Sequence, residues 1–166
     1  VRYANLPDYP EKTSNLERML SGGTWGMFFN NTYDTLVTDS AAAATQMATG
    51  KFSRPGAIGQ DYKGVSVQNI LEMARQKGMS VGVVTDAYVT DATPAAFTAH
   101  TQNRQQHMKI ARQMINFGPE VIMGGGLKYF SIGENEKLLD KAKAKGYQVV
   151  TDKKALAEVT SGKVLG

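Results

Sequence analysis

The chain has 166 residues, a length typical of one globular domain. Apolar residues make up 42% and charged residues 20%, which excludes a disordered chain, and no apolar run is long enough to span a membrane. The net charge of +4 is uneven, because residues 1–100 carry −1 and residues 101–166 carry +5. The absence of cysteine and the presence of only two histidines exclude disulfides, a thiol nucleophile and a His-rich metal site.

Helices are expected where apolar residues recur with helical spacing and a capping residue or glycine marks an end. Ser14 and Glu17 are spaced as a capping box for the first helix. A short helix around Pro94 is expected to have Thr93 as its N-cap. Four further helices are expected at 40–49, from 67 to the glycine at 78, at 105–116 and at 134–145. A last short helix is expected after the aspartate at 152.

Extended segments are expected at 24–29 and 33–38 around a turn at Asn30-Asn31. Four later segments read as strands, the first of them buried: 80–85, 120–123, 147–151 and the run that starts at residue 163. From residue 67 onward, strands and helices alternate with short connections. This alternation predicts an α/β fold with a mainly parallel sheet flanked by helices on both faces.

Ser40 follows an extended run and occupies the first position of the helix expected at 40–49. A helix N-terminus offers unpaired N–H groups and a positive dipole end, which bind anions and stabilise an alkoxide. Ser40 is therefore a candidate nucleophile toward phosphate or an acyl group. The alternative is that Ser40 is simply an N-cap, the commoner role at such a place. The sequence around it is not G-x-S-x-G, so an α/β-hydrolase triad gains no support.

Asp91 and Thr93 lie just beyond the strand expected at 80–85, where ligands bind in parallel sheets. Their carboxylate and hydroxyl suit a hard cation such as Mg²⁺, with helix capping as the alternative. Arg104 lies near the end of the next helix, where its guanidinium suits bidentate phosphate binding. The alternative for Arg104 is a solvated surface arginine.

Other residues carry weaker signals. His100 and His107, seven residues apart, could share one helix face and are interpreted as surface or half-buried histidines. The glycine triplet at 124–126 lacks the full dinucleotide fingerprint. Lysines at 137, 141 and 145 have helical spacing, but no aromatic residues interleave with them. They are interpreted as a solvated helix face rather than as a nucleic-acid surface.

Residues 39–50, DSAAAATQMATG, resemble the nucleophile signature of the alkaline phosphatases, Asp-Ser-Ala-(Ala/Ser)-x-Ala-Thr-x-x-Ala-Thr-Gly. The similarity continues in the same order and spacing through further segments: 56–59, 70–74, 91–97, the histidine at 100, 103–104 and 124–126. The chain is therefore identified as a member of the alkaline phosphatase family, of the bacterial type.

The resemblance implies roles for five residues. Ser40 matches the serine that attacks phosphorus, becomes phosphoserine and ligates zinc when deprotonated. Arg104 matches the arginine that holds two phosphate oxygens, and Asp39 matches the residue that orients it. Thr93 matches a hydroxyl ligand of the magnesium site, and Asp91 matches a position that supports this magnesium through water. Family members carry Asp or His at this last position, so Asp91 favours magnesium.

The family resemblance also implies an activity. This is hydrolysis of phosphate monoesters at alkaline pH through a phosphoserine intermediate, with two zinc ions and one magnesium ion in the full-length enzyme. The implied small-molecule partners are phosphomonoesters and inorganic phosphate, with no nucleic-acid recognition and no membrane span. The resemblance further implies a periplasmic or secreted protein and allows a homodimer at full length.

Part of the family pattern is missing. The chain opens at Val1, carries no recognisable signal peptide, and lacks both the Gly-Asp-Gly-Met-Gly metal-ligand strand and the C-terminal zinc-binding half. Residues 1–166 are therefore expected to form a single, incomplete alkaline phosphatase domain that is inactive in isolation. One alternative is a non-catalytic phosphate-binding fragment, or a half-enzyme that needs a second chain. Another is action on phosphodiesters or sulfates, against which the Asp-Ser-Ala signature weighs.

Overall fold

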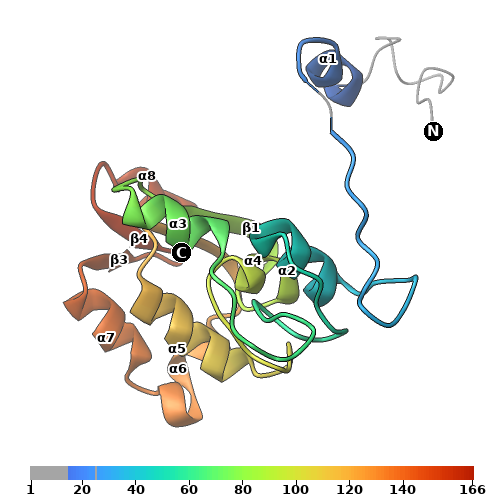
Figure 1. Cartoon of the computed structure of the whole chain (residues 1–166). Helices are drawn as coiled ribbons and strands as arrows, with labels where there is room; N and C mark the ends of the chain where they lie inside the picture. Colours follow the sequence, from blue (N-terminus) through green and yellow to red (C-terminus); the bar gives the residue numbers. More distant parts are fainter. Residues whose placement is uncertain (1–14, 25) are drawn as a thin grey trace, which may run out of the picture.

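Parallel strands form the sheet around which the chain is organised (Figure 1). The computed structural model describes residues 15–24 and 26–166. Within these residues the sheet has four strands in the order β1-β2-β4-β3, and every neighbouring pair is parallel. The strands are β1 (Gly82–Tyr88), β2 (Val121–Gly125), β3 (Tyr147–Val149) and β4 (Lys163–Leu165). The predicted parallel α/β fold is confirmed.

Helices precede, connect and cover these strands. The α-helices are α1 (Asn15–Ser21), α2 (Ser40–Thr49), α3 (Ile70–Gln76), α4 (Ala92–Ala96), α5 (His107–Phe117), α6 (Lys128–Ser131), α7 (Leu138–Ala144) and α8 (Lys153–Ala157), and η2 (Gly133–Asn135) is a short 3-10 helix. None of the described helices is long and apolar enough to cross a membrane.

One row of side chains across the sheet forms the floor of the core. Val83 of β1 pairs in register with Ile122 of β2, Ile122 with Leu165 of β4, and Leu165 with Val149 of β3. These four residues belong to, or pack against, one buried cluster, which also includes the apolar faces of α5, α6 and α7. These three helices lie on one side of the sheet, and α3 and α8 lie on the other (Figure 1).

Strand β1 lies at the edge of the sheet and is not the buried strand predicted at 80–85. Among the described strands it pairs with β2 alone, and Val84, which follows Val83 and points to the opposite face of the sheet, is 72% exposed. The β-branched run of this strand fits equally well in a central or an edge strand, so its composition did not distinguish the two. The strand also extends beyond the predicted end at 85 to Tyr88.

Helix starts were predicted less well than helix ends. Helix α3 begins at Ile70 and not at residue 67, because Asn69 and Glu72 form a capping box. The Asn69 side chain accepts from the Glu72 N–H, and the Glu72 carboxylate accepts from the Asn69 N–H. Helix α7 begins at Leu138, after two short helical turns, and not at 134. Asp152 caps α8 as predicted, and its carboxylate accepts from Ala155 N–H.

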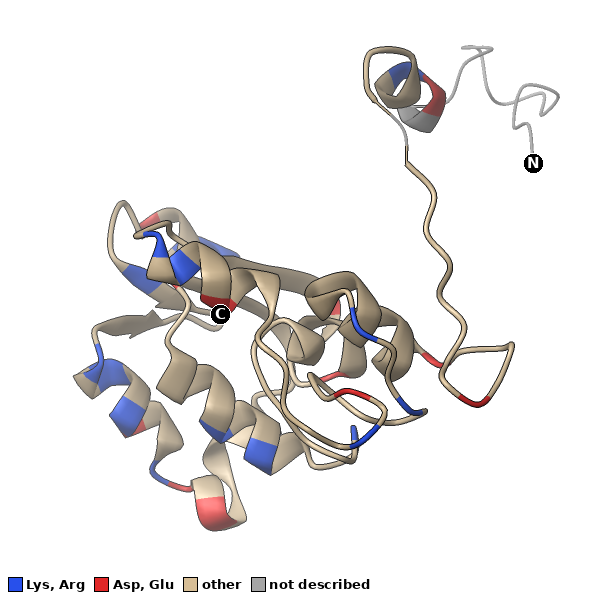
Figure 2. Cartoon of the chain, viewed as in Figure 1, with Lys and Arg blue, Asp and Glu red and all other residues tan. Residues whose placement is uncertain are grey.

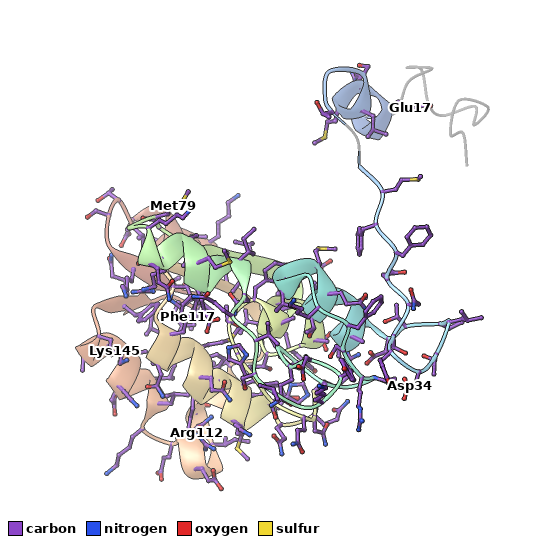
Figure 3. All side chains as sticks on the ribbon, viewed as in Figure 1. Glu17, Asp34, Met79, Arg112, Phe117 and Lys145 are labelled. Carbon is purple, nitrogen blue, oxygen red and sulfur yellow. The ribbon has the colours of Figure 1, made fainter. Side chains whose placement is uncertain are left out.

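The two extended segments predicted at 24–29 and 33–38 form no strand in the described residues. The chain instead turns where Thr32 N–H donates to Thr35 O. Met27, Phe29 and Leu36 are more than 90% exposed, and Figure 3 shows side chains of this arm projecting around an isolated trace. An extended segment becomes a strand only beside a partner strand, and within the part of the chain that the structure describes none lies beside residues 26–38. The capping Ser14 lies outside the described residues, as does residue 25.

Helices α2 and α4 pack closely because both are rich in alanine. Ala41 and Ala44 of α2 belong to the same buried cluster as Ala92, Ala95 and Ala96 of α4. Small side chains allow two helices to approach more closely than leucines would. The alanine run in 40–49 thus serves packing as well as helix propensity. This packing brings together the N-terminal regions of α2 and α4, where the candidate site lies.

Candidate functional site

Two aspartates cap the paired helices and face one arginine. The Asp39 carboxylate caps α2 by accepting from Ala42 N–H at 3.0 Å, and the Asp91 carboxylate caps α4 by accepting from Ala92 N–H at 2.7 Å. Of the two capping candidates that the sequence offered for α4, Asp91 is therefore the cap and Thr93 is not. Likewise the cap of α2 is Asp39 and not Ser40, which leaves the Ser40 hydroxyl available for other contacts.

The guanidinium of Arg104 joins the two helix starts. Its Nη1 donates to Ser40 Oγ at 2.6 Å and to Asp39 Oδ2 at 3.3 Å, while Nη2 donates to Asp91 Oδ1 at 2.8 Å. The Arg104 side chain is 25% exposed. The structure therefore brings together four of the five residues singled out from the sequence: Asp39, Ser40, Asp91 and Arg104.

Asp91 is held as a carboxylate. Burial alone would raise the pKa of Asp91, but the hydrogen bond from Ala92 N–H, the hydrogen bond and charge of Arg104 and the nearby His107 outweigh it. The pKa of Asp91 therefore lies below its ordinary value. The capping role and the contact with Arg104 both depend on this charge.

Ser40 has the surroundings of an activated hydroxyl. It is exposed, it is the first residue of the ten-residue helix α2, and its Oγ accepts a hydrogen bond from a permanent cation. The helix dipole and the Arg104 charge both favour negative charge at this oxygen. The arrangement places an exposed hydroxyl at a helix N-terminus beside a cationic fork.

Gly56 is a contributor that the residue-by-residue reasoning did not single out. Its N–H donates to Asp39 Oδ2 at 3.1 Å, and its carbonyl accepts from Arg104 N–H at 2.8 Å. Gly56 thus connects the backbone of Arg104 to Asp39, the same carboxylate that the Arg104 side chain contacts. The only sequence signal was the family likeness of residues 56–59, because a backbone contact leaves no mark on residue type.

A scan against protein-family models matches residues 9–166 to the family described as alkaline phosphatase. The chain belongs to the alkaline phosphatase family. It is 36% identical to alkaline phosphatase 4 of Bacillus subtilis over 168 residues, which cover 98% of this chain and 36% of that protein. The cold-active alkaline phosphatase of a psychrophilic Shewanella superposes with a TM-score of 0.87 at 40% identity, covering 99% of this chain and 40% of that structure.

A third similar structure is a His-to-Asp variant of the alkaline phosphatase of the Antarctic bacterium TAB5, solved with Mg bound in its M3 site. It has a TM-score of 0.75 and 32% identity, and covers 84% of this chain and 41% of that chain. The present chain thus spans about two fifths or less of the length of these alkaline phosphatases.

Thr93 is the fifth candidate site residue. Among the described residues it makes no hydrogen bond with the Ser40 cluster, which consists of Asp39, Ser40, Asp91 and Arg104. The Thr93 side chain is exposed and lines a groove beside β1 together with Thr85 and Pro94. Within residues 15–24 and 26–166, no three His, Cys, Asp or Glu side chains are arranged to hold a metal ion. Asp91 and Thr93 carry oxygen atoms of the type that Mg²⁺ prefers, but the described residues bring together no set of side chains that would hold zinc.

The two histidines do not share a helix face, contrary to prediction. His107 is the first residue of α5, and His100 precedes that helix on a loop. Both are half-buried as predicted: His100 Nδ1 donates to Gly59 O at 2.7 Å, and the His107 ring stacks on Tyr129. The lysines at 137, 141 and 145 are exposed along and beside α7 (Figure 2), which fits a solvated face.

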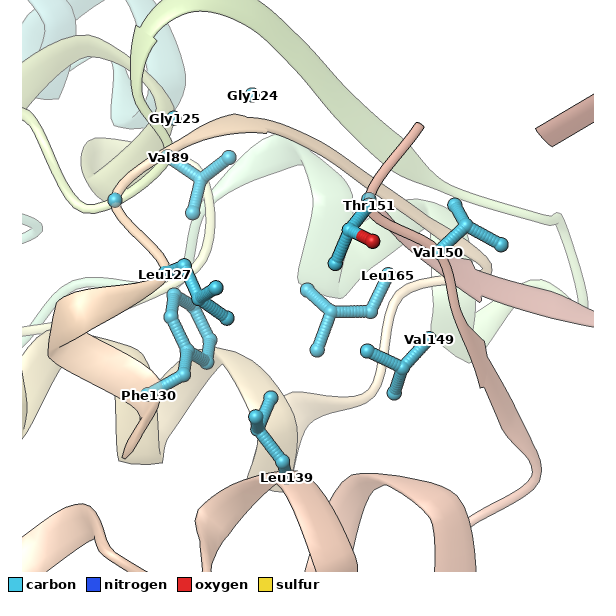
Figure 4. A pocket seen from close by; sticks show the side chains of 12 residues that line it. Val89, Gly124, Gly125, Leu127, Phe130, Leu139, Val149, Val150, Thr151 and Leu165 are labelled. Atoms are coloured by element: carbon cyan, nitrogen blue, oxygen red, sulfur yellow. The ribbon is translucent and has the colours of Figure 1, made fainter. Parts of the chain in front are cut away.

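An apolar cavity of about 190 Å³ lies elsewhere, beyond the ends of β2, β3 and β4. Leu127, Phe130 and Leu139 project into it from one side and Val149 and Leu165 from another (Figure 4). No titratable side chain lines it, and none of its lining residues belongs to the Ser40 cluster. The cavity is therefore separate from the candidate functional site.

Proposed function

We propose that this chain supplies the nucleophile and the phosphate-binding arginine of an alkaline phosphatase, which hydrolyses phosphate monoesters through a phosphoserine intermediate. The observation that carries the proposal is the 2.6 Å contact between Arg104 Nη1 and Ser40 Oγ at the N-terminus of α2. The family of the chain supports the phosphatase over a separate anion-binding module.

In the proposed first half of the reaction, Ser40 loses its hydroxyl proton and its Oγ attacks phosphorus. The new Oγ–P bond forms as the bond to the leaving alcohol oxygen breaks, and the departing oxygen takes up a proton in turn. The oxygens of a phosphoryl group on Ser40 would lie within reach of the Arg104 guanidinium. The N–H groups that bind them would be the ones that donate to Ser40 and Asp91 in the present structure. The fork of Arg104 then stabilises the charge that develops on these oxygens. Attack by water on phosphoserine releases inorganic phosphate and restores Ser40.

The charge of the cluster supports a requirement for cations. Asp39 and Asp91 carry two negative charges against the single positive charge of Arg104. A phosphate dianion would therefore meet a net negative cluster, which is unfavourable unless further cations are bound. We propose that two zinc ions and one magnesium ion fill this role at full length, with Asp91 and Thr93 on the magnesium side. When bound, such ions favour the serine alkoxide and the leaving oxygen, and activity rises toward alkaline pH.

The extent of the chain leads to further proposals. Because its relatives are much longer, we propose that residues 1–166 form one incomplete domain and that the other metal ligands lie elsewhere in the full-length protein. The isolated chain is then inactive. By analogy with the bacterial relatives, we propose a periplasmic or secreted enzyme that forms a homodimer at full length.

The test is a comparison of Ser40→Ala with the unaltered full-length protein, loaded with zinc and magnesium. Hydrolysis of a generic aryl phosphate is measured at alkaline pH, and the phosphoenzyme is trapped by acid quenching with labelled phosphate. We expect Ser40→Ala to abolish trapping and to lower kcat by roughly 10⁴-fold or more. Ordinary turnover by Ser40→Ala would refute the nucleophile, and hydrolysis of sulfate esters in preference would refute the substrate class.

A further inference from the structure

Thr45 lies on the same helix as Ser40 but faces the protein interior. Its side chain is completely buried, and both hydrogen-bonding capacities of its hydroxyl are used outside the helix. Thr45 Oγ1 donates to Ala57 O at 3.2 Å and accepts from Gly59 N–H at 3.0 Å. Thr45 thus attaches helix α2 to residues 56–59, the segment that we call the splint, in addition to the hydrogen bond from Gly56 N–H to the capping Asp39.

The splint continues directly to Arg104. Ile58 and Thr101 exchange two backbone hydrogen bonds of 2.8 and 2.9 Å, and Arg104 N–H donates to Gly56 O at 2.8 Å. The backbone that carries the arginine therefore runs antiparallel to the splint over residues 101–104. Any shift of the splint along α2 carries the Arg104 guanidinium with it, away from or toward Ser40.

The attachment at Gly59 leaves little room for such a shift. Gly59 has a φ of +60°, and a Cβ at this position would lie 2.4 Å from Ala99 O and 2.5 Å from His100 Nδ1. The Gly59 carbonyl accepts from His100 Nδ1 at 2.7 Å, while the Gly59 N–H donates to Thr45 Oγ1. The splint is fixed between the nucleophile helix on one side and the loop leading to Arg104 on the other.

We propose that Thr45 is a positioning residue for phosphate binding, which sets the distance between the Arg104 fork and Ser40 through the splint. This inference rests on the proposed function, since it concerns the same phosphate. Thr45 touches neither the phosphate nor the reacting oxygen, and its effect passes through Arg104. A misplacement of about 1 Å in a group that binds the transition state costs on the order of 100-fold in rate.

The test uses Thr45→Val, which keeps the shape and burial of the side chain but removes both hydrogen bonds. In the metal-loaded full-length protein we expect kcat/KM and the affinity for inorganic phosphate to fall roughly 10- to 100-fold. Thr45→Ser, which keeps the hydroxyl, restores most of both. Thr98→Val is the matched control. Thr98 is also buried, and among the described residues its hydroxyl donates to Pro94 O and Ala95 O in the preceding turn.

A double-mutant cycle with Arg104→Ala separates positioning from general loss of stability. If Thr45 acts through Arg104, Thr45→Val changes phosphate affinity by less than about twofold once Arg104 is absent. An equal loss in both backgrounds, or unchanged phosphate affinity in Thr45→Val alone, overturns the inference. Should Thr45→Val fail to fold, Thr45→Ala enters the same cycle. The proposed function is tested separately, by turnover of Ser40→Ala and by the preference between phosphate and sulfate esters, neither of which depends on Thr45.

Discussion

Arg104 Nη1 donates to Ser40 Oγ at 2.6 Å although 64 residues separate the two in the sequence. The contact depends on three parts of the fold. Close packing of alanines places α2 against α4, capping by Asp39 frees the serine hydroxyl, and Gly56 holds the backbone of the arginine. A phosphate at this place would meet the proposed nucleophile, a helix N-terminus and the two guanidinium nitrogens of Arg104 at once.

The shape of the Arg104 side chain should matter as much as its charge. Arg104→Lys keeps one positive charge, but a single ammonium cannot reach both Ser40 and Asp91 in the way the two guanidinium nitrogens do. We expect the inhibition constant of inorganic phosphate to rise roughly 10- to 100-fold, as for loss of a hydrogen bond to a charged group. This inhibition constant is measured from competitive inhibition of turnover by inorganic phosphate at fixed pH and ionic strength.

Arg112→Lys provides the control for this substitution. Arg112 contacts Glu134 and Asn135 beside α5, away from the Ser40 cluster, and its label in Figure 3 marks that position. Phosphate inhibition should not change in this variant. Equal effects of the two substitutions would mean that Arg104 acts only through the overall charge of the protein.

Gly59 should tolerate no side chain. In Gly59→Ala the new Cβ clashes with Ala99 O and the His100 ring, and the positive φ adds strain. We expect a loss of about 3 kcal/mol or more in the free energy of unfolding. Gly78→Ala is the matched control, because Gly78 has a similar φ of +75° but nothing within 4 Å of the new Cβ. Its loss should be about 1–2 kcal/mol, and urea unfolding of both variants compares them.

Tyr147 should make stability decrease at strongly alkaline pH. Burial raises the pKa of Tyr147 above its ordinary value of 10.0, and its hydroxyl donates to Pro119 O. The folded state therefore keeps a proton that the unfolded chain releases above about pH 10, so this contribution is complete below pH 10 and declines as pH rises further.

Tyr147→Phe tests this contribution. At neutral pH the variant should lose about 1–3 kcal/mol, because the Pro119 carbonyl is left without its donor. Above pH 10 its free energy of unfolding should fall less steeply than that of the unaltered protein. Urea unfolding at pH 8 and pH 11 provides the comparison. A parallel decline in both proteins would show that other groups control alkaline stability.

Local sequence signals predicted the elements whose cause is local. The Ala-rich run that ends at Gly50 is α2, and Gly50 takes the left-handed conformation expected of a helix end. The same holds for Asp152, which caps α8. The sequence was less decisive where two neighbouring residues can do one task. It offered both Thr93 and Asp91 as caps of α4, and the Asp91 carboxylate takes that place, where it also contacts Arg104.

The sequence by itself determined the family, the parallel α/β fold and the identity of Ser40, Arg104, Asp39, Asp91 and Thr93 as candidates, because these follow from a signature of fixed residue types and from periodicity. It did not determine which of them meet. Only the tertiary structure joined Arg104 to Ser40 and both aspartates and left Thr93 beside β1. The reason is that these contacts are set by the packing of α2 on α4 and by backbone hydrogen bonds of residues 56–59. Neither depends on residue type in a way that a single sequence displays.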